Sequence, residues 1–284
     1  MKEFKDKVAV ITGAASGIGF GLAEHAAKEG MKVVLADVEE DALRKAEKQI
    51  RELGVDTLAV KTDVSKAEDV EALAEKTISA FGAVHLLCNN AGVGAGNEGW
   101  CSLLDWKWVL GVNLWGVIHG VHFFVPIMLK QDTECHIVNT SSVGGLVSVS
   151  GNTPYAVSKH GVVALSENSY LQLKQMNSKI GVSVICPGII DTNILDCDRN
   201  RPAELQKESE EPLNQEMMET IRKVFADGMP PSELAEIVFD AIKESQFYIY
   251  PNAEQYMDAV RTRAENVMLG RNPSIEITIQ EADE

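Results

Sequence analysis

Positive charge is scarce in this chain. The 26 lysines and arginines are outnumbered by 42 aspartates and glutamates, giving a formal net charge of −16. Such an imbalance opposes non-specific binding to nucleic acid or to an anionic membrane surface. Much of the acid lies in polar stretches such as 208–211 and 281–284, so the charge does not identify a substrate. We therefore expect neither a nucleic acid nor a membrane as a partner.

Cysteines are few, and their number and spacing do not indicate disulfide pairs. Their number is odd and they form no CxxC pair: Cys88, Cys101, Cys135, Cys186 and Cys197. The N-terminus lacks the apolar core of a signal peptide, and no apolar run reaches the roughly 18 residues of a membrane span. This pattern predicts reduced, mostly structural thiols in a cytoplasmic protein.

The chain also lacks repeats, low-complexity blocks and linkers, so we expect one domain over residues 1–284. Strand-like apolar runs alternate with helical stretches, a pattern typical of a parallel sheet with right-handed crossovers. The expected strands are 8–11, 32–36, 57–61, 84–88, 136–140, 181–186 and 247–250. The expected helices are 22–29, 39–53, 66–80, 102–130, one starting near 155, 233–243 and 253–269. Residues 190–229 lose this periodicity and are predicted to form a substrate lid, and 252–284 form a C-terminal extension with a polar tail that we expect to be disordered.

A glycine-containing loop follows the first strand and opens the first helix. Gly13 permits a backbone angle closed to other residues, while Gly17 and Gly19 are predicted to let a pyrophosphate approach the helix start. A tight turn without a ligand is the alternative. Asp37, eighteen positions after Gly19, ends the second strand, where a carboxylate can bind ribose hydroxyls and repel a 2′-phosphate.

No arginine or lysine stands at residues 38–41 to bind such a phosphate, so NAD(H) is favoured, with NADP(H) not excluded. Asp37 could also cap the helix 39–53.

Three side chains that can move a proton converge at a later strand end. Tyr155 and Lys159 are four positions apart and share a helix face, and Ser142 lies thirteen positions before Tyr155. Tyr170 and Lys174 have the same spacing in the same helix, but position 157, thirteen before Tyr170, is a valine. Tyr170 and Lys174 are therefore interpreted as a coincidence.

The helix 102–130 carries polar groups within an aromatic stripe that is typical of a core or a subunit interface. Asn113 lies beside glycines in an apolar setting and needs a hydrogen-bond partner. His119 and His122 have metal-ligand spacing, but no acidic or cysteine partner is nearby in sequence, so packed or surface histidines and no metal are expected.

Taken together, these motifs resemble the short-chain dehydrogenase/reductase family over residues 5–250. The resemblance is carried by Thr12-Gly13-x-x-x-Gly17-x-Gly19, Asp63-Val64, Asn89-Asn90-Ala91-Gly92, Asn113, Ser142, Tyr155-x-x-x-Lys159 and Pro187-Gly188 with Thr192. It implies a single doubly wound, Rossmann-type α/β domain with a seven-stranded parallel sheet. It also implies a cofactor site formed by Gly13, Ser16, Gly17, Ile18, Gly19, Asp37, Asp63, Val64, Asn90, Ala91, Gly92, Tyr155, Lys159, Pro187, Gly188 and Thr192.

The expected chemistry is hydride transfer between a nicotinamide and a secondary alcohol or ketone. Tyr155 would be the acid or base, with Lys159 favouring tyrosinate and Ser142 holding the substrate oxygen. In the family's pattern Lys159 also holds the nicotinamide ribose, and Asn113 supports a water-linked proton path. A 3-oxoacyl-type reductase and a non-catalytic NAD(H) sensor are the alternatives.

A hydrophobic substrate, steroid-like or alicyclic, is favoured by apolar candidates on the lid side. These are Val143, Leu146, Val149, Ile189, Ile194, Leu195 and Met217. The resemblance further implies a homodimer or homotetramer.

Overall fold

The computed structural model describes residues 1–94, 101–148, 151–206 and 215–274. The acidic run 208–211, the polar tail and Val149 lie outside the described residues.

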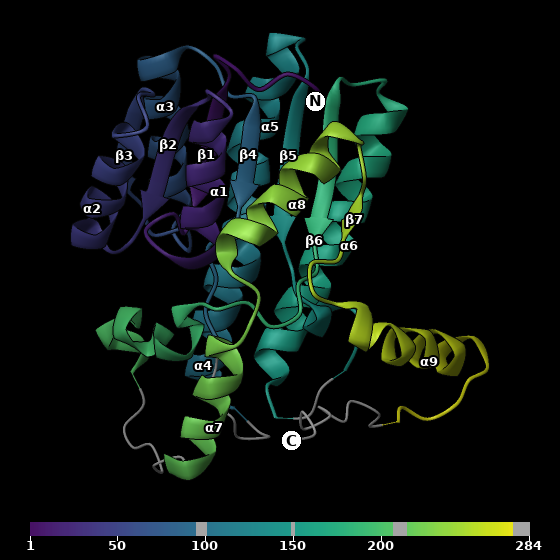
Figure 1. Ribbon diagram of the computed structural model, residues 1–284. Coiled ribbons are helices and arrows are strands. Elements are labelled where there is room, and N and C mark those ends of the chain that lie inside the picture. The colour runs from purple at the N-terminus through teal and green to yellow at the C-terminus, as the bar shows by residue number, and fades with distance from the viewer. Residues whose placement is uncertain (95–100, 149–150, 207–214, 275–284) are drawn as a thin grey trace.

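Seven parallel strands form one sheet at the centre of the molecule (Figure 1). The order across the sheet is β3-β2-β1-β4-β5-β6-β7. The strands are β1 Val8–Thr12, β2 Lys32–Asp37, β3 Thr57–Lys61, β4 Leu86–Asn89, β5 Cys135–Thr140, β6 Ile180–Ile185 and β7 Tyr248–Ile249. Buried β-branched runs such as Val8–Thr12 suit strands covered on both faces. This architecture confirms the predicted doubly wound, seven-stranded fold.

Helices cover both faces of this sheet. One core contains residues of α1 Gly17–Lys28, α2 Glu40–Arg51 and α8 Pro231–Lys243. The opposite core contains residues of α3 Ala67–Phe81, α5 Gly116–Gln131 and α6 Thr153–Gln175. The two layers keep the central strands dry, and Ile11, Leu35 and Leu87 are fully buried.

The strand order reverses between β1 and β4, so a crevice opens at their carboxyl ends. Figure 1 shows α4 Leu103–Leu110, α7 Gln215–Ala226 and α9 Met257–Met268 beyond that edge of the sheet. The fold therefore places the predicted lid and the C-terminal helix on the same side as the glycine loop.

The predicted helix 102–130 is interrupted by a π-helical turn, η1 Gly111–Trp115, between α4 and α5. A π turn inserts one residue into the helix and is common at functional sites. Asn113 lies in this turn, and its amide makes three hydrogen bonds inside the protein. The sequence did not predict the interruption, because its cause is these distant partners.

The helical stretch Leu103–Gln131 is also long and apolar enough to cross a membrane, by length and composition alone. No uninterrupted apolar run of about 18 residues was expected, and this stretch passes by its mean hydropathy although polar residues such as Asn113 and His119 interrupt it. The evidence for a span is weak, because a core helix passes the same test. Here α5 packs on α3, and α4 packs on α6.

The predicted lid begins and ends at one place. Ile190 and Met229 form a parallel bridge, Asp191 N donates to Met229 O over 3.0 Å, and Met229 N donates to Ile189 O over 3.2 Å. Between them lie the 3₁₀ segments η3 Asn193–Asn200 and η4 Ala203–Leu205, and then α7.

The C-terminal extension is helical, as expected. It contains the 3₁₀ turn η5 Glu254–Tyr256 and α9, which projects from the body in Figure 1 and buries none of its residues. Tyr256 reaches back, because its side chain lines the main cavity.

Candidate active site

A cavity of about 1340 Å³ lies along the carboxyl ends of the strands. Among the described residues it is lined by the glycine loop, the ends of β2, β3, β4, β5 and β6, the helix α4, and the segments η3 and α7. Every predicted site residue lines this cavity except Gly19 and Asn113. The structure thus brings together side chains that the sequence spreads over 180 positions.

The acid–base side chains meet at the end of β5. Ser142 and Tyr155 line the same part of the cavity, on either side of Gly144, and Ser142 Oγ accepts from Gly144 N over 3.1 Å. The Lys159 Nζ lies 5.5 Å from the centre of the Tyr155 ring. The same Nζ donates to the carbonyl oxygen of Thr140 over 3.0 Å. Thr140 was not among the predicted site residues, although it ends the strand that leads to Ser142.

Burial dominates the electrostatics of this pair. It raises the pKa of Tyr155, and the polar side chain of Ser142 opposes that rise only in part. Burial also lowers the pKa of Lys159 to about 8. The protein alone therefore does not produce the lowered tyrosine pKa that we expected from Lys159, because both groups lie in a low-dielectric setting that disfavours charge.

Asn113 does not line the cavity, but it is hydrogen-bonded to Val93, which does. It is 1% exposed, its Oδ1 accepts from Val93 N over 2.8 Å, and its Nδ2 donates to Val93 O over 2.9 Å. Its Nδ2 also donates to Ser158 Oγ over 3.1 Å, and Ser158 Oγ donates to Tyr155 O over 2.7 Å. Asn113 thus links the helix α6 to the loop after β4. Ser158 was missed because a serine inside a helix gives no signal in sequence.

The glycine loop connects β1 to α1. Gly13 and Gly17 adopt φ of 66° and 53°, and a Cβ on Gly13 would lie 2.8 Å from Ala91 Cα. Ser16 is the N-cap and its side chain makes no capping bond, and Ser16, Gly17 and Ile18 all line the cavity. The structure gives Gly19 a packing requirement as well, because a Cβ there would lie 2.0 Å from Gly13 O. Its hydrogen lets the helix pack on the loop.

Asp37 binds backbone on both sides of it. Its Oδ2 accepts from Ala15 N and its Oδ1 from Glu39 N, each over 3.0 Å. Burial raises its pKa, and these hydrogen bonds counteract the rise. The helix α2 begins at Glu40 with Glu39 as its N-cap, so the predicted capping role of Asp37 is replaced by a bond to Glu39.

The loops after β3 and β4 form the neighbouring walls. Asp63 Oδ1 accepts from Ser65 N and Oγ, and Val64 O accepts from His119 Nδ1 over 2.9 Å. Asn90 Nδ2 donates to Thr12 O over 3.1 Å. These bonds hold Asp63, Val64, Asn90, Ala91 and Gly92 along the cavity.

The loop after β6 closes the far side. Pro187 O accepts from Val143 N over 3.0 Å, and Gly188 N donates to Pro251 O over 3.1 Å. Thr192 caps η3 without a side-chain bond, and its methyl group lies near Gly17.

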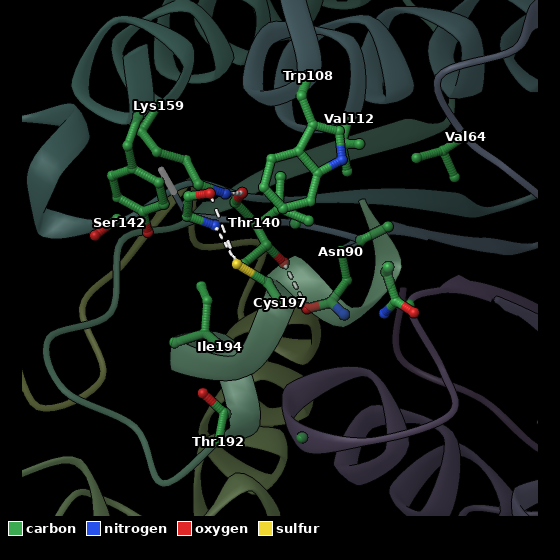
Figure 2. Close-up of a pocket in the computed structure, with 18 of the residues that line it drawn as sticks. Val64, Asn90, Trp108, Val112, Thr140, Ser142, Lys159, Thr192, Ile194 and Cys197 are labelled. Atoms are coloured by element: carbon green, nitrogen blue, oxygen red, sulfur yellow. Dashed lines mark hydrogen bonds between the residues drawn. The ribbon is translucent and has the colours of Figure 1, made fainter. Parts of the chain in front are cut away.

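At one end of the cavity Tyr155 packs against an apolar cluster that includes Val93, Trp108 and Cys197. Trp108, Ile194 and Cys197 are grouped there, and Figure 2 shows them around the same space as Ser142 and Lys159. The Cys197 thiol accepts from Gly94 N over 3.2 Å, and burial raises its pKa.

The predicted apolar candidates divide in two. Val143, Ile189, Ile194 and Leu195 line the cavity, whereas Leu146 and Met217 do not. Met217 is 55% exposed, and its neighbour Met218 lines the cavity instead, because the helical phase of α7 could not be set from sequence.

Two further sequence motifs, His119 with His122 and Tyr170 with Lys174, have other partners in the structure. His119 is bonded to Val64 and His122 packs against the Phe123 ring, and the described part of the chain contains no group of three or more potential metal ligands. Tyr170 stacks edge-on against Phe247, away from the residues that line the cavity.

Comparison with known proteins identifies the family to which the chain belongs. Residues 7–202 match the family described as short chain dehydrogenase. A CLA biosynthesis dehydrogenase/reductase of Lactiplantibacillus plantarum is 33% identical over 282 residues, which cover 98% of each protein. A cyclohexanol dehydrogenase of Acinetobacter sp. strain SE19 is 35% identical over 68% of this chain and 76% of that protein.

Among solved structures, a short-chain dehydrogenase/reductase from Burkholderia phymatum, in complex with NAD, is similar with a TM-score of 0.93 at 44% identity. The similarity covers 98% of this chain and 100% of that one. The protein is therefore an oxidoreductase and belongs to the short-chain dehydrogenase/reductase family.

Proposed function

We propose that the protein transfers a hydride between NAD(H) and a hydrophobic secondary alcohol or ketone, with Asn113, Ser142, Tyr155 and Lys159 as its catalytic set. The observation that carries this proposal is one cavity that is lined by Ser142, Tyr155 and Lys159 and also by the glycine loop and Asp37. The phenol of Tyr155 can transfer a proton to or from a substrate oxygen, and the hydroxyl of Ser142 can donate a hydrogen bond to that oxygen. A dinucleotide would fill the rest of the cavity.

The residues present fit a dinucleotide. The uncapped N–H groups at the start of α1 are donors for a pyrophosphate, and the absence of side chains at Gly13 and Gly17 leaves the backbone accessible. Asp37 is placed for the adenosine ribose, and its carboxylate would repel a 2′-phosphate, which favours NAD(H). Asp63 and Val64 are assigned to the adenine, Asn90, Ala91 and Gly92 to the central cleft, and Pro187, Gly188 and Thr192 to the nicotinamide amide.

The proton would move at the Tyr155 hydroxyl. In reduction Tyr155 donates its proton to the substrate oxygen, and in oxidation tyrosinate accepts the proton of the alcohol. Ser142 donates a hydrogen bond to the same oxygen and stabilises its developing charge. Nicotinamide, when bound, supplies or accepts the hydride, and its oxidised form adds a positive charge.

Lys159 would hold the nicotinamide ribose while its ammonium stays bonded to Thr140. Because burial raises the pKa of Tyr155, the protein favours the neutral phenol. This state is ready for reduction, and oxidation requires higher pH or the added positive charge.

The substrate would bind between Trp108, Ile194 and Cys197, an apolar setting next to the polar side chains of Tyr155, Ser142 and Lys159. An alicyclic or steroid-like alcohol suits such a space, and the cyclohexanol dehydrogenase relative acts on an alcohol of this class. The segment 190–229 would act as the lid of a single domain.

We propose a homodimer or homotetramer in the cytoplasm. Leu103 and Trp115 on the long helix, and Val157 and Leu171 on α6, are 84%, 53%, 44% and 56% exposed. Large exposed apolar groups on adjacent helices mark contact surfaces. Light scattering coupled to gel filtration tests this assembly.

The deciding experiment is a screen of alicyclic, steroidal and linear ketones and alcohols, run separately with NAD(H) and NADP(H). We expect turnover of an alicyclic or steroidal compound with NAD(H). Turnover of 3-oxoacyl thioesters with NADPH would instead support the reductase alternative. NADH binding, measured by fluorescence, without turnover of any compound would favour a sensor.

A further inference from the structure

The segment 193–205, formed by η3 and η4, lines the cavity, and we refer to it as the strap. Two of its residues, Arg199 and Asn200, line the same cavity as Asp37 and Glu39, although 160 positions separate Arg199 from Glu39. The strap is therefore bonded to the residue two positions after Asp37, the residue that the proposed function assigns to the adenosine ribose.

On the Asp37 side the strap is fastened by one carboxylate oxygen. Glu39 Oε1 accepts from Arg199 Nε over 3.1 Å, from Arg199 Nη2 over 2.7 Å, and from Asn200 Nδ2 over 2.7 Å. Arg199 Nη1 donates to Asn193 O and Asp196 O, so the strap itself orients the guanidinium. This contact is partly open to solvent, with 38% of the Arg199 and 28% of the Glu39 side chain exposed.

The next residue, Arg201, is held on the α4 side of the strap by a buried ion pair. Arg201 Nη2 lies 2.6 Å from Asp105 Oδ1, and these side chains are 4% and 2% exposed. Arg201 also donates to Leu205 O over 2.8 Å and lies over the Trp108 ring. Asp105 is fixed in turn by the capping box with Ser102.

The two fastenings differ in strength for a physical reason. A solvent-exposed ion pair contributes little net stability, whereas separating a buried pair leaves a charge without a partner in a dry setting. The Glu39 contact therefore opens long before the Arg201 contact does. The strap can move on the adenosine side while it keeps its apolar residues against Trp108.

We propose that Glu39, Arg199 and Asn200 form a latch that holds the dinucleotide in place, and that Arg201 with Asp105 is the hinge about which the strap opens. This rests on the proposed binding of NAD(H) beside Asp37. Glu39 and Arg199 are then positioning residues, since they act by keeping the strap closed. The adenosine end enters and leaves only when Glu39 is released.

The test uses stopped-flow fluorescence of the full-length protein loaded with NADH and mixed with an excess of NAD⁺. Arg199→Ala and Glu39→Gln should each raise the NADH dissociation rate constant about 3- to 10-fold, with little change in the thermal midpoint of the free protein. The charge-swapped double variant, Glu39→Arg with Arg199→Glu, should recover part of the slow release. Arg44→Ala is the matched control, because it removes an exposed pair with Glu40 that does not contact the strap.

The outcomes separate the latch from the function on which it rests. If the unmodified protein does not bind NADH, the proposed function fails. If it binds NADH, but Arg199→Ala and Glu39→Gln release it at the rate of the unmodified protein and of Arg44→Ala, the latch is wrong. Faster release in only one single variant, or in both without recovery in the double variant, also contradicts a shared contact.

Discussion

The ammonium of Lys159 is bonded to the carbonyl oxygen of Thr140, 3.0 Å away, while its distance from the centre of the Tyr155 ring is 5.5 Å. The lysine is thereby held at the end of β5 before any ligand binds. Its orientation is set by the sheet, which also sets Ser142.

Replacing Lys159 with methionine should change how stability depends on pH. Burial lowers the pKa of Lys159 to about 8 from 10.5, so between these values the unfolded chain binds more protons and native stability rises with pH. Lys159→Met lacks this rise. Its free energy of unfolding should exceed that of the unmodified protein near pH 7, and the excess should shrink from pH 8 to 10.5. Urea titrations at four pH values measure it, and a constant difference across the range contradicts the shifted pKa.

Tyr155→Phe should reduce turnover by at least about 10²- to 10⁴-fold, because it removes the acid–base group. NADH affinity should stay nearly unchanged. Tyr170→Phe is the matched control, since Tyr170 has the same spacing to a lysine, with its ring packed against Phe247 instead of in the cavity. Steady-state rates and NADH fluorescence titrations measure both. A Tyr155→Phe enzyme with near-normal turnover would refute the assignment.

Asp37→Asn should weaken the preference for NAD(H) over NADP(H) by about tenfold or more. The amide keeps an acceptor for Ala15 N or Glu39 N but loses the charge that repels a 2′-phosphate. Dissociation constants of NADH and NADPH, measured on both proteins, give the ratio. An unchanged ratio, or a strong preference of the unmodified protein for NADPH, means that Asp37 does not select the cofactor.

Asn113→Leu should destabilise the protein by about 2–5 kcal/mol, because Val93 N, Val93 O and Ser158 lose their partner in a buried setting. Turnover should fall as well, through the displaced loop after β4. Denaturant unfolding and rates at a temperature where the variant is folded separate the two effects. Full stability would show that the π turn does not depend on this amide.

Local patterns were sufficient for the sheet and for much of the cavity. Asp37, Ser142 and Tyr155 were predictable because each follows or starts an element that apolar runs define, and parallel strand ends meet at one edge. The packing requirement at Gly19 was not predictable, since sequence does not show that Gly13 O occupies the space beside it.

Contacts between segments far apart in the sequence could not be predicted. Glu39 and Arg199 are 160 positions apart, and Asp105 and Arg201 are 96 apart, so no spacing rule connects them. No basic residue stands at 38–41, yet the fold places Arg199 against Glu39. The raised pKa of Tyr155 was missed for a similar reason, because it depends on burial by residues from several elements.

The parallel bridge between Ile190 and Met229 makes the segment between them an exchangeable cassette. Its two ends are already neighbours, and the part of it that the structure describes contributes no strand to the sheet, so a cassette from a relative can be spliced in without reconnecting the core. Whether the cassette fits also depends on residues outside it, because the recipient must have carboxylates at the positions of Glu39 and Asp105, which pair with the strap. Transplanting substrate preference within this family therefore requires moving two anchoring residues along with the cassette.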